Sequence, residues 1–147
     1  MSSIDVVAMR RMLGLFAHAF DEPETYCAKQ PDDAYLRQLL DCETFIAVAA
    51  LSHEDVIGGI AGYILPKFEQ RRSEFYIYDL AVAEAYRRKG VATAMIKELK
   101  GIATRRGIYG IFAHADHGDD AAIALYAKLG TREEVLHFDI DPSEVNA

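Results

Sequence analysis

A strand followed closely by a helix that starts at a glycine is the feature that most restricts the fold of this 147-residue chain. The segment SEFYIYDLAV (Ser73–Val82) is rich in aromatic and aliphatic residues, which is typical of a buried strand. Apolar residues then recur at helical spacing from about Lys89 to Arg106, and a second strand pattern, IYGIFAHA (108–115), follows. This order predicts a βαβ unit, in which two strands run parallel in one sheet.

The rest of the chain predicts three more helices and three more strands. The predicted helices are Met9–Phe20, QPDDAYLRQLL (30–40) with Asp32 as its cap, and Asp119–Leu129, which Gly130 closes. The predicted strands are TFIAVAAL (44–51), VIGGIAGYIL (56–65), which Pro66 ends, and EEVLHFDI (133–140). This mixture without repeats or linkers predicts an α/β or α+β fold, with residues 1–147 forming a single domain.

Composition restricts the partners. The net charge of −7 disfavours nucleic acid and favours a cationic partner. Because no apolar run is long enough to span a membrane and no signal peptide is recognised, a cytoplasmic protein is expected. Cys27 and Cys42 are too few and too poorly spaced for a disulfide framework or a zinc site, so we expect two reduced thiols.

Three cations, Arg87–Lys89, stand just before Gly90 at the start of the predicted βαβ helix. Helix N-termini present unpaired N–H groups and partial positive charge, so cations there are unfavourable unless an anion binds. A solvated basic turn is the simpler interpretation. The segment is neither a Walker P-loop nor a G-x-G-x-x-G motif, so the sequence predicts a diphosphate site of another kind.

Two motifs resemble those of the GNAT acetyltransferases. Arg87-x-x-Gly90-x-Ala92 is similar to the family's Q/R-x-x-G-x-G/A loop, which binds the pyrophosphate of acetyl-CoA. DDAAIALYAKLG is similar to a second motif, with Ala122, Leu125, Tyr126 and Gly130 in register and Asp119 where asparagine is usual. This resemblance covers about Phe45–Ile140.

One branch of the family is closer still. LPKFEQ, Phe75–Val82, GDD and REEVLHFDIDP resemble the type I aminoglycoside 3-N-acetyltransferases, from about Met9 onward. The family fold is a single mixed, largely antiparallel sheet, flanked by helices and splayed at the acetyl-CoA site. Only SSIDVV (2–7) precedes the first helix, so the family's first strand is expected to be short or absent, and Thr131 replaces a common aromatic residue.

The resemblance implies which residues contact acetyl-CoA, the cosubstrate. They are Leu80, Ala81 and Val82 through their main chain, the loop residues Arg87, Arg88, Lys89, Gly90, Val91, Ala92 and Thr93, and Asp119, Ala122 and Tyr126 of the second motif. The pantetheine arm would insert beside the strand like an additional strand.

Two residues are candidates for catalysis. Asp79 is a lone carboxylate in an apolar strand, which costs free energy unless structure or function retains it. It either pairs with an arginine or a backbone N–H, or binds the substrate amine as ligand or base. Tyr126 is either a core aromatic or, as the resemblance implies, the donor of a proton to the CoA sulfur.

Carboxylates near the expected acetyl site are candidates for binding a cationic substrate. They are Glu22, Glu24, Asp79, Asp116, Asp119, Asp120, Glu133, Glu134 and Asp139, each of which can also be an ordinary surface acid or a helix cap. His114 and His117 flank Asp116, but in a strand they would point to opposite faces, so no metal site is expected.

Together with these features, the resemblance implies an N-acetyltransferase that acts on the 3-amino group of 2-deoxystreptamine aminoglycosides of the gentamicin kind and thereby confers antibiotic resistance. The amine would attack the thioester directly in a ternary complex. Two alternatives stay open: an acetyltransferase for another polyamine or small amine, and a CoA-binding module without catalysis. Dimers are common in the family, so a homodimer is an expected form.

Overall fold

The structure is a computed structural model that describes residues 4–144. The helices are α1 (Val6–Ala19), α2 (Pro23–Tyr26), α3 (Asp33–Asp41), α4 (Val91–Arg106) and α5 (Asp120–Leu129), with a short 3₁₀ turn, η1 (Glu84–Tyr86). The strands are β1 (Phe45–Ser52), β2 (Asp55–Pro66), β3 (Ser73–Val82) and β4 (Ile108–Ala113). Caps explain several of the bounds: Asp5 accepts a hydrogen bond from the Ala8 N–H at 2.8 Å, and Asp32 accepts one from Tyr35 at 2.9 Å.

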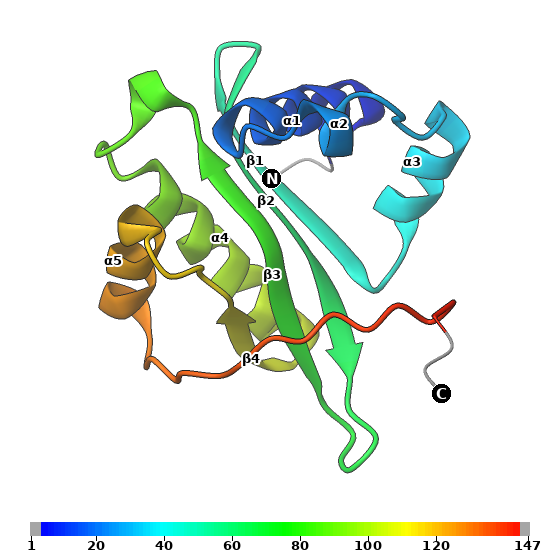
Figure 1. The fold of residues 1–147 in the computed structure, drawn as a ribbon, viewed down its shortest axis with the longest axis vertical. Helices are drawn as coiled ribbons and strands as arrows, with labels where there is room; N and C mark the ends of the chain where they lie inside the picture. The colour runs from blue at the N-terminus through cyan, green and yellow to red at the C-terminus, as the bar shows by residue number, and fades with distance from the viewer. Residues whose placement is uncertain (1–3, 145–147) are drawn as a thin grey trace.

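The strands form one mixed sheet in the order β1-β2-β3-β4 (Figure 1). The first two pairings are antiparallel, and β3 pairs with β4 in parallel, as the βαβ pattern predicts. This parallel pairing reaches only Ile77 on β3 and Ala113 on β4. Beyond Ile77, β3 continues to Val82 with no partner on that side among the described residues. The predicted fold class, a mixed sheet that splays, is therefore confirmed.

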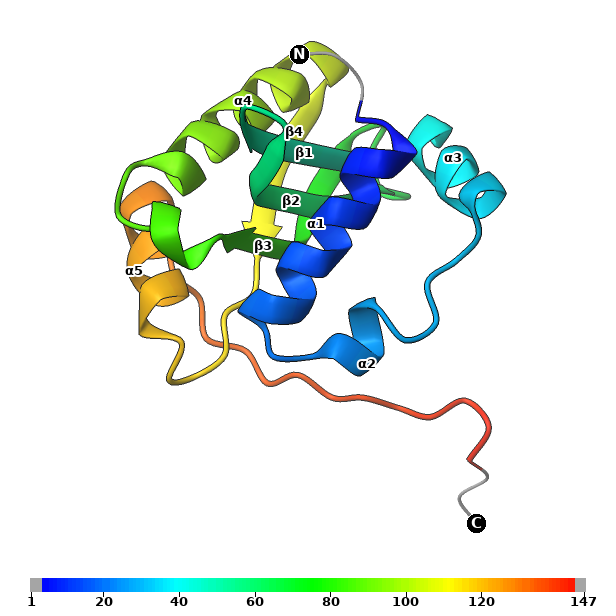
Figure 2. The same cartoon turned by 90° about the horizontal axis from the view of Figure 1, so that it is seen from above.

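Helices cover both faces of the sheet (Figure 2). On one face α1 buries Met9, Met12 and Phe16, and on the other α4 buries Met95 and Leu99. Gly59 of β2 allows the close approach of α1, because a Cβ atom there would collide with the sulfur of Met12. These two apolar layers hold the strands whose ends build the site.

A β-bulge interrupts the pairing of β3 with β2. Ala61 pairs with Asp79 and Gly62 pairs with Ile77, so Tyr78 is an extra residue on β3. Side chains alternate across a strand, and an extra residue reverses the alternation beyond it. Ile77 accordingly packs in the α4 layer, whereas Asp79 lies on the face covered by α1 and α2, where it contacts Tyr26.

Several predictions need correction. The predicted strand 133–140 is wrong, because these residues are extended and exposed without a ladder partner. The strand predicted over 108–115 ends at Ala113, and α2 was not predicted. Ser2 and Ser3 of SSIDVV lie outside the described residues, and its last two residues begin α1. No helix in residues 4–144 is both long and apolar enough to cross a membrane.

Candidate active site

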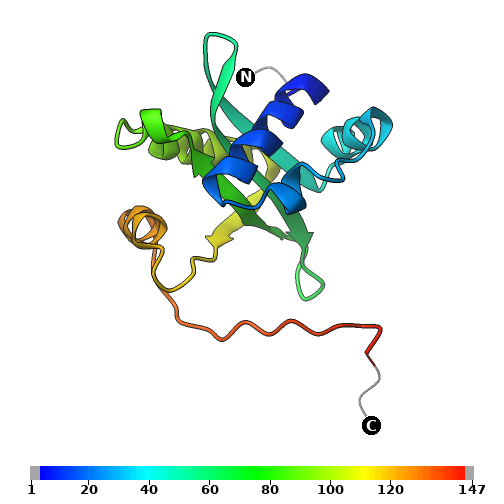
Figure 3. The same ribbon diagram turned by 45° about the horizontal axis from the view of Figure 1, so that its top comes forward.

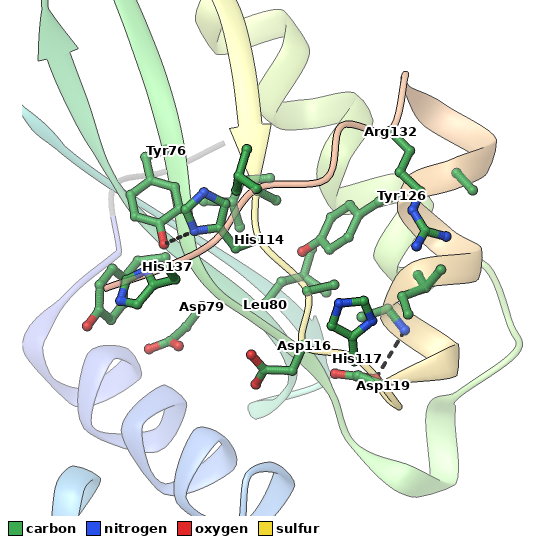
Figure 4. Close-up of a pocket in the computed structure, with 18 of the residues that line it drawn as sticks. Tyr76, Asp79, Leu80, His114, Asp116, His117, Asp119, Tyr126, Arg132 and His137 are labelled. Carbon is green, nitrogen blue, oxygen red and sulfur yellow. Dashed lines mark hydrogen bonds between the residues drawn. The ribbon is translucent and has the colours of Figure 1, made fainter. Parts of the chain in front are cut away.

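A cavity of about 1070 Å³ opens at the splayed side of the sheet (Figure 4). Its lining comes from Tyr76–Leu80 of β3, the end of β4, the inner side of α5, and Glu22 and Tyr26 around α2. Residues Thr131–His137, which follow α5, also line it. The cavity is at the upper end of the size range of ligand sites, and its lining mixes polar and aromatic groups.

Asp79 is one of the lining residues, and the bulge at Tyr78 places it on this face of the sheet. Its Oδ2 accepts a hydrogen bond from the Tyr26 hydroxyl at 3.0 Å. Burial raises the pKa of the Asp79 carboxyl above its usual value, the Tyr26 hydrogen bond opposes the rise, and the charge of Glu22 adds to it. No arginine pairs with Asp79 in the described part of the chain, so the ion-pair interpretation has no support there.

Tyr26 is the site residue that sequence reasoning missed. It ends α2, and its ring packs against Phe16 and Phe20 of the first helix region at centroid distances of 5.9 and 5.8 Å. Its carbonyl accepts a hydrogen bond from the Gln30 side chain at 3.0 Å. Burial and the neighbouring Asp79 raise the pKa of Tyr26, so its hydroxyl stays protonated and donates. A four-residue helix has too little periodicity to be read from sequence.

Tyr126 projects from α5 toward the cavity, and its hydroxyl faces the β3 side (Figure 4). The side chain packs at the margin of the apolar layer between the sheet and α4, so its ring contributes to packing. Burial, with Asp119 and Asp79 as further causes, raises the pKa of Tyr126 to about 12. The hydroxyl is therefore protonated at neutral pH and able to donate.

The structure brings together most of the predicted substrate acids. Glu22, Asp79, Asp116, Asp119, Glu133 and Glu134 line the cavity, whereas Asp120, Glu24 and Asp139 are not among the lining residues. Two of the lining acids already have partners. Asp119 caps α5 by accepting a hydrogen bond from the Ala122 N–H at 3.2 Å, and Glu134 forms an ion pair with Arg132.

His114 and His117 both line the cavity, because β4 ends at Ala113 and the alternation of a strand does not extend to them. The prediction that they would lie on opposite faces is therefore wrong. His114 is hydrogen-bonded through Nδ1 to the Tyr76 hydroxyl at 3.1 Å. Within residues 4–144 no group of three His, Cys, Asp or Glu side chains is arranged to hold a metal ion.

The turn before α4 is built around Gly90. Gly90 adopts φ +81°, the left-handed region that favours glycine, and a Cβ atom there would meet nothing within 4 Å. No side chain caps this end of α4, so its first N–H groups face an open approach. Arg88 and Lys89 are exposed, while Arg87 holds the turn against β3 by donating from Nε to the Val82 carbonyl at 3.0 Å.

The last part of β3 lies between this turn and the cavity. Leu80, Ala81 and Val82 pair with β2 on one side only. Their side chains pack into the core, so only main-chain groups are presented at the open edge. The Val82 carbonyl already accepts a hydrogen bond from Arg87. The main-chain contacts expected with acetyl-CoA are therefore left to Leu80 and Ala81.

A splayed mixed sheet, a glycine turn at the helix after the splayed strand, and a polar cavity at the open edge define an acetyltransferase of the GNAT class. The acetyltransferase (GNAT) family matches residues 11–131, and the chain belongs to this family. Members of the family transfer the acetyl group of acetyl-CoA. No curated protein matches the sequence.

The chain resembles solved structures over most of its length. The chain is 53% identical to the aminoglycoside acetyltransferase HMB0005 from an uncultured soil metagenomic sample, covering 97% of this chain and 95% of that one with a TM-score of 0.93. It is 26% identical to the aminoglycoside acetyltransferase meta-AAC0020, also from an uncultured soil metagenomic sample and bound to sisomicin, with coverage of 96% and 92% and a TM-score of 0.87. AAC(6')-Iy, bound to a bisubstrate analogue of CoA and acetylneamine, shares the fold at 17% identity, with 95% of both chains covered and a TM-score of 0.74.

Proposed function

We propose that this protein transfers the acetyl group of acetyl-CoA to the 3-amino group of 2-deoxystreptamine aminoglycosides of the gentamicin kind, and so confers resistance to them. The observation that carries the proposal is the half-buried carboxylate of Asp79 at the open edge of the sheet, in a cavity with five further acids in its lining. The aminoglycoside acetyltransferases among the similar structures support this acceptor. Residues 1–147 would act as one domain in the cytoplasm, in keeping with the exposed free thiols of Cys27 and Cys42.

The residues of the α4 turn fit a diphosphate. Gly90 leaves open space above the main chain, the N–H groups of Val91, Ala92 and Thr93 have no cap, and Arg88 and Lys89 supply charge. In this proposal the turn binds the pyrophosphate of acetyl-CoA, and the main chain around Leu80 binds the pantetheine arm. The cavity beside Leu80 is also lined by Asp119, Ala122 and Tyr126, at the start and on the inner side of α5. Acetyl-CoA supplies the acetyl group as a thioester.

Asp79 acts on the acceptor. An ammonium group has no lone pair, so the amine must lose a proton before or as its nitrogen attacks the thioester carbonyl carbon. The Asp79 carboxylate binds the ammonium and takes up that proton, directly or through water. Burial raises its pKa, which makes it a stronger base than an exposed aspartate, and the Tyr26 hydroxyl keeps it oriented.

Tyr126 acts on the leaving group. As the new C–N bond forms, the C–S bond breaks and its electron pair stays on sulfur. The Tyr126 hydroxyl, protonated at neutral pH because its pKa is about 12, gives its proton to that sulfur. Tyr126 regains a proton from solvent. The net reaction turns ammonium and thioester into amide, free thiol and one released proton.

The remaining acids select a polycation. Glu22, Asp116, Asp119, Asp120 and Glu134 are proposed to bind the other ammonium groups of the drug, and all of them except Asp120 reach the cavity lining. Because Asp119 also caps α5 and Glu134 pairs with Arg132, we expect Glu22 and Asp116 to contribute most. Both carboxylates are exposed in the wall of the cavity.

A thiol-release assay with a panel of amines tests the acceptor. Gentamicin, sisomicin, spermidine and a small monoamine are each supplied with acetyl-CoA, and NMR of the product identifies the acetylated nitrogen. Release with the aminoglycosides and acetylation at the 3-amino group are expected. Equal or faster release with spermidine would favour a general polyamine acetyltransferase, and binding of acetyl-CoA without release for any amine would favour a module without catalysis.

A further inference from the structure

The short helix α2 keeps its place through contacts with other parts of the chain. A helix of four residues has too few internal hydrogen bonds to be stable by itself. In Figure 3 the chain leaves the end of α1, forms α2 and turns back to α3, which begins beside the first turns of α1. The residues that join α2 to these two helices therefore determine where the Tyr26 hydroxyl lies.

Arg10 of α1 is the residue at which these elements meet. Its guanidinium donates from Nη1 to Oε1 of Gln30 at 2.7 Å and from Nη2 to the Pro31 carbonyl at 3.0 Å. Its Nε and Nη2 also donate to Oδ1 of Asp33, at 3.3 and 2.6 Å. The planar fork of an arginine can bind several acceptors at once in a fixed geometry. Arg10 therefore holds both the loop after α2 and the start of α3.

Gln30 connects this guanidinium to α2. Its side-chain oxygen accepts the hydrogen bond from Arg10, and its Nε2 donates to the Tyr26 carbonyl at 3.0 Å. Because a guanidinium only donates, it selects the amide orientation in which the oxygen faces Arg10 and the nitrogen faces Tyr26. The Tyr26 hydroxyl in turn donates to Oδ2 of Asp79 at 3.0 Å. Three hydrogen bonds in series thus link Arg10 to the carboxylate.

The ring contacts of Tyr26 leave the exact place of its hydroxyl to these hydrogen bonds. The ring packs against Phe16 and Phe20 at interplanar angles of 58° and 42°. Apolar burial is non-directional, whereas a hydrogen bond weakens steeply as its angle departs from linear. The bond from Gln30 holds the main chain from which the ring projects. It thereby sets the length and angle of the bond to Asp79.

We propose that Arg10 and Gln30 are positioning residues for acetyl transfer: acting through Tyr26, they hold its hydroxyl on Asp79 and so set how readily this carboxylate takes up a proton. This role rests on the function proposed for Asp79. Neither Arg10 nor Gln30 is among the residues that line the cavity, so both act without touching the acceptor.

Several other titratable groups face Asp79. Those that interact with its charge are Glu22 before α2, Tyr63 of β2, Tyr76 of β3 and Tyr126 of α5. His114, His117, His137, Arg132 and the lining carboxylates already described belong to the same cavity. A substitution at Gln30 removes none of these groups and changes no charge. A change in the titration of Asp79 that it causes is therefore assigned to the bond from Tyr26.

Carbon-13 NMR of the full chain, labelled at its aspartate carboxyls and without CoA or acceptor, tests the link; the Asp79 signal is identified by its loss in Asp79→Asn. Gln30→Met keeps the length of the side chain and removes both of its hydrogen bonds. Full loss of a hydrogen bond to a carboxylate corresponds to about one pH unit or more. The titration midpoint of Asp79 should therefore rise by about half a pH unit, and the acidic limb of kcat/KM should move with it. In a Tyr26→Phe background the same substitution should cause no further shift.

Arg10→Met should raise the Asp79 midpoint as well, and Arg37→Met is its matched control. Arg37 carries an equal charge beside the same Asp33, at 4.0 Å, and should leave the midpoint unchanged. Gln30→Met decides the result if Arg10→Met fails to fold. An unchanged midpoint in Gln30→Met, a further shift in the Tyr26→Phe background, or an equal shift by Arg37→Met would each overturn the proposal. A raised midpoint with an unmoved acidic limb would support the link and overturn the proposed role of Asp79 as the base.

Discussion

The hydroxyl of Tyr26 lies 3.0 Å from Oδ2 of Asp79 and donates a hydrogen bond to it, across 53 positions of sequence. Two opposed effects meet in this contact. Burial raises the pKa of the Asp79 carboxyl, and the hydrogen bond, which stabilises the charged form, lowers it. The fraction of Asp79 that is ionised near neutral pH therefore depends on a residue of the short helix α2.

Tyr26→Phe should shift the pH dependence of acetylation. The ring keeps its packing against Phe16 and Phe20, but without the hydroxyl the pKa of Asp79 rises further. The acidic limb of the kcat/KM profile should move to higher pH, so the loss of activity is larger at about pH 6 than at about pH 8. Tyr35→Phe, which removes an exposed hydroxyl on α3, is the matched control. An equal loss at all pH values would assign Tyr26 a purely structural role.

Asp79→Asn should abolish most turnover at neutral pH, by about a hundredfold or more, while calorimetry finds normal CoA binding. The stability of this variant, compared with wild type, should also depend on pH. Because folding raises the pKa of Asp79, its ionisation in the folded state costs stability as the pH rises through that pKa. The Tm of the variant relative to wild type should therefore increase between about pH 4 and about pH 7. A variant that unfolds at neutral pH would instead identify Asp79 as a structural residue.

Tyr126→Phe should separate catalysis from packing. The ring remains at the margin of the core, so Tm should change little, whereas turnover should fall on the order of a hundredfold. Since the pKa of Tyr126 is about 12, its titration should produce no basic limb near neutral pH in the wild-type profile. Full turnover by the phenylalanine variant would leave water as the proton donor.

Gly90→Val should weaken CoA binding far more than Arg88→Ala does. Gly90 has φ +81°, which a β-branched residue rarely adopts, so valine would displace the main-chain donors of the turn. Arg88 is exposed, and loss of one exposed charge is expected to cost no more than about fivefold in affinity. Isothermal titration calorimetry with CoA measures both. Similar losses would mean that the turn binds through charge rather than through its backbone.

The parts of the fold that were predicted correctly depend mostly on residues that are close together in the sequence. Asp32 caps α3, Gly107 ends α4 in the left-handed region, and β3 spans the predicted Ser73–Val82. Each of these depends on residues close in sequence. The same holds for the turn at Gly90, whose position before a helix was readable from its cations and its glycine.

What could not be predicted depends on distant or absent partners. The strand pattern at 133–140 is real, but a strand needs a ladder partner, and none of the described residues supplies one. The positions of His114 and His117 could not be read because no local signal marked the end of β4 at Ala113. The contact of Tyr26 with Asp79 joins a four-residue helix to a strand far along the chain, and no periodicity of apolar residues in the sequence indicates it.

The bulge at Tyr78 has a consequence for how this site can change in evolution. The side of the sheet that Asp79 faces depends on how β3 pairs with β2 around Tyr78, not only on which residues β3 contains. If β3 kept all its residues but paired regularly with β2, Ile77 and Asp79 would share a face, and the carboxylate would point into the apolar layer beneath α4. Deleting Tyr78 would instead make Ile77 and Asp79 adjacent and leave them on opposite faces. Loss of the bulge without loss of a residue is thus equivalent to losing the acid, and an alignment that ignores the extra residue compares side chains on opposite faces of the sheet.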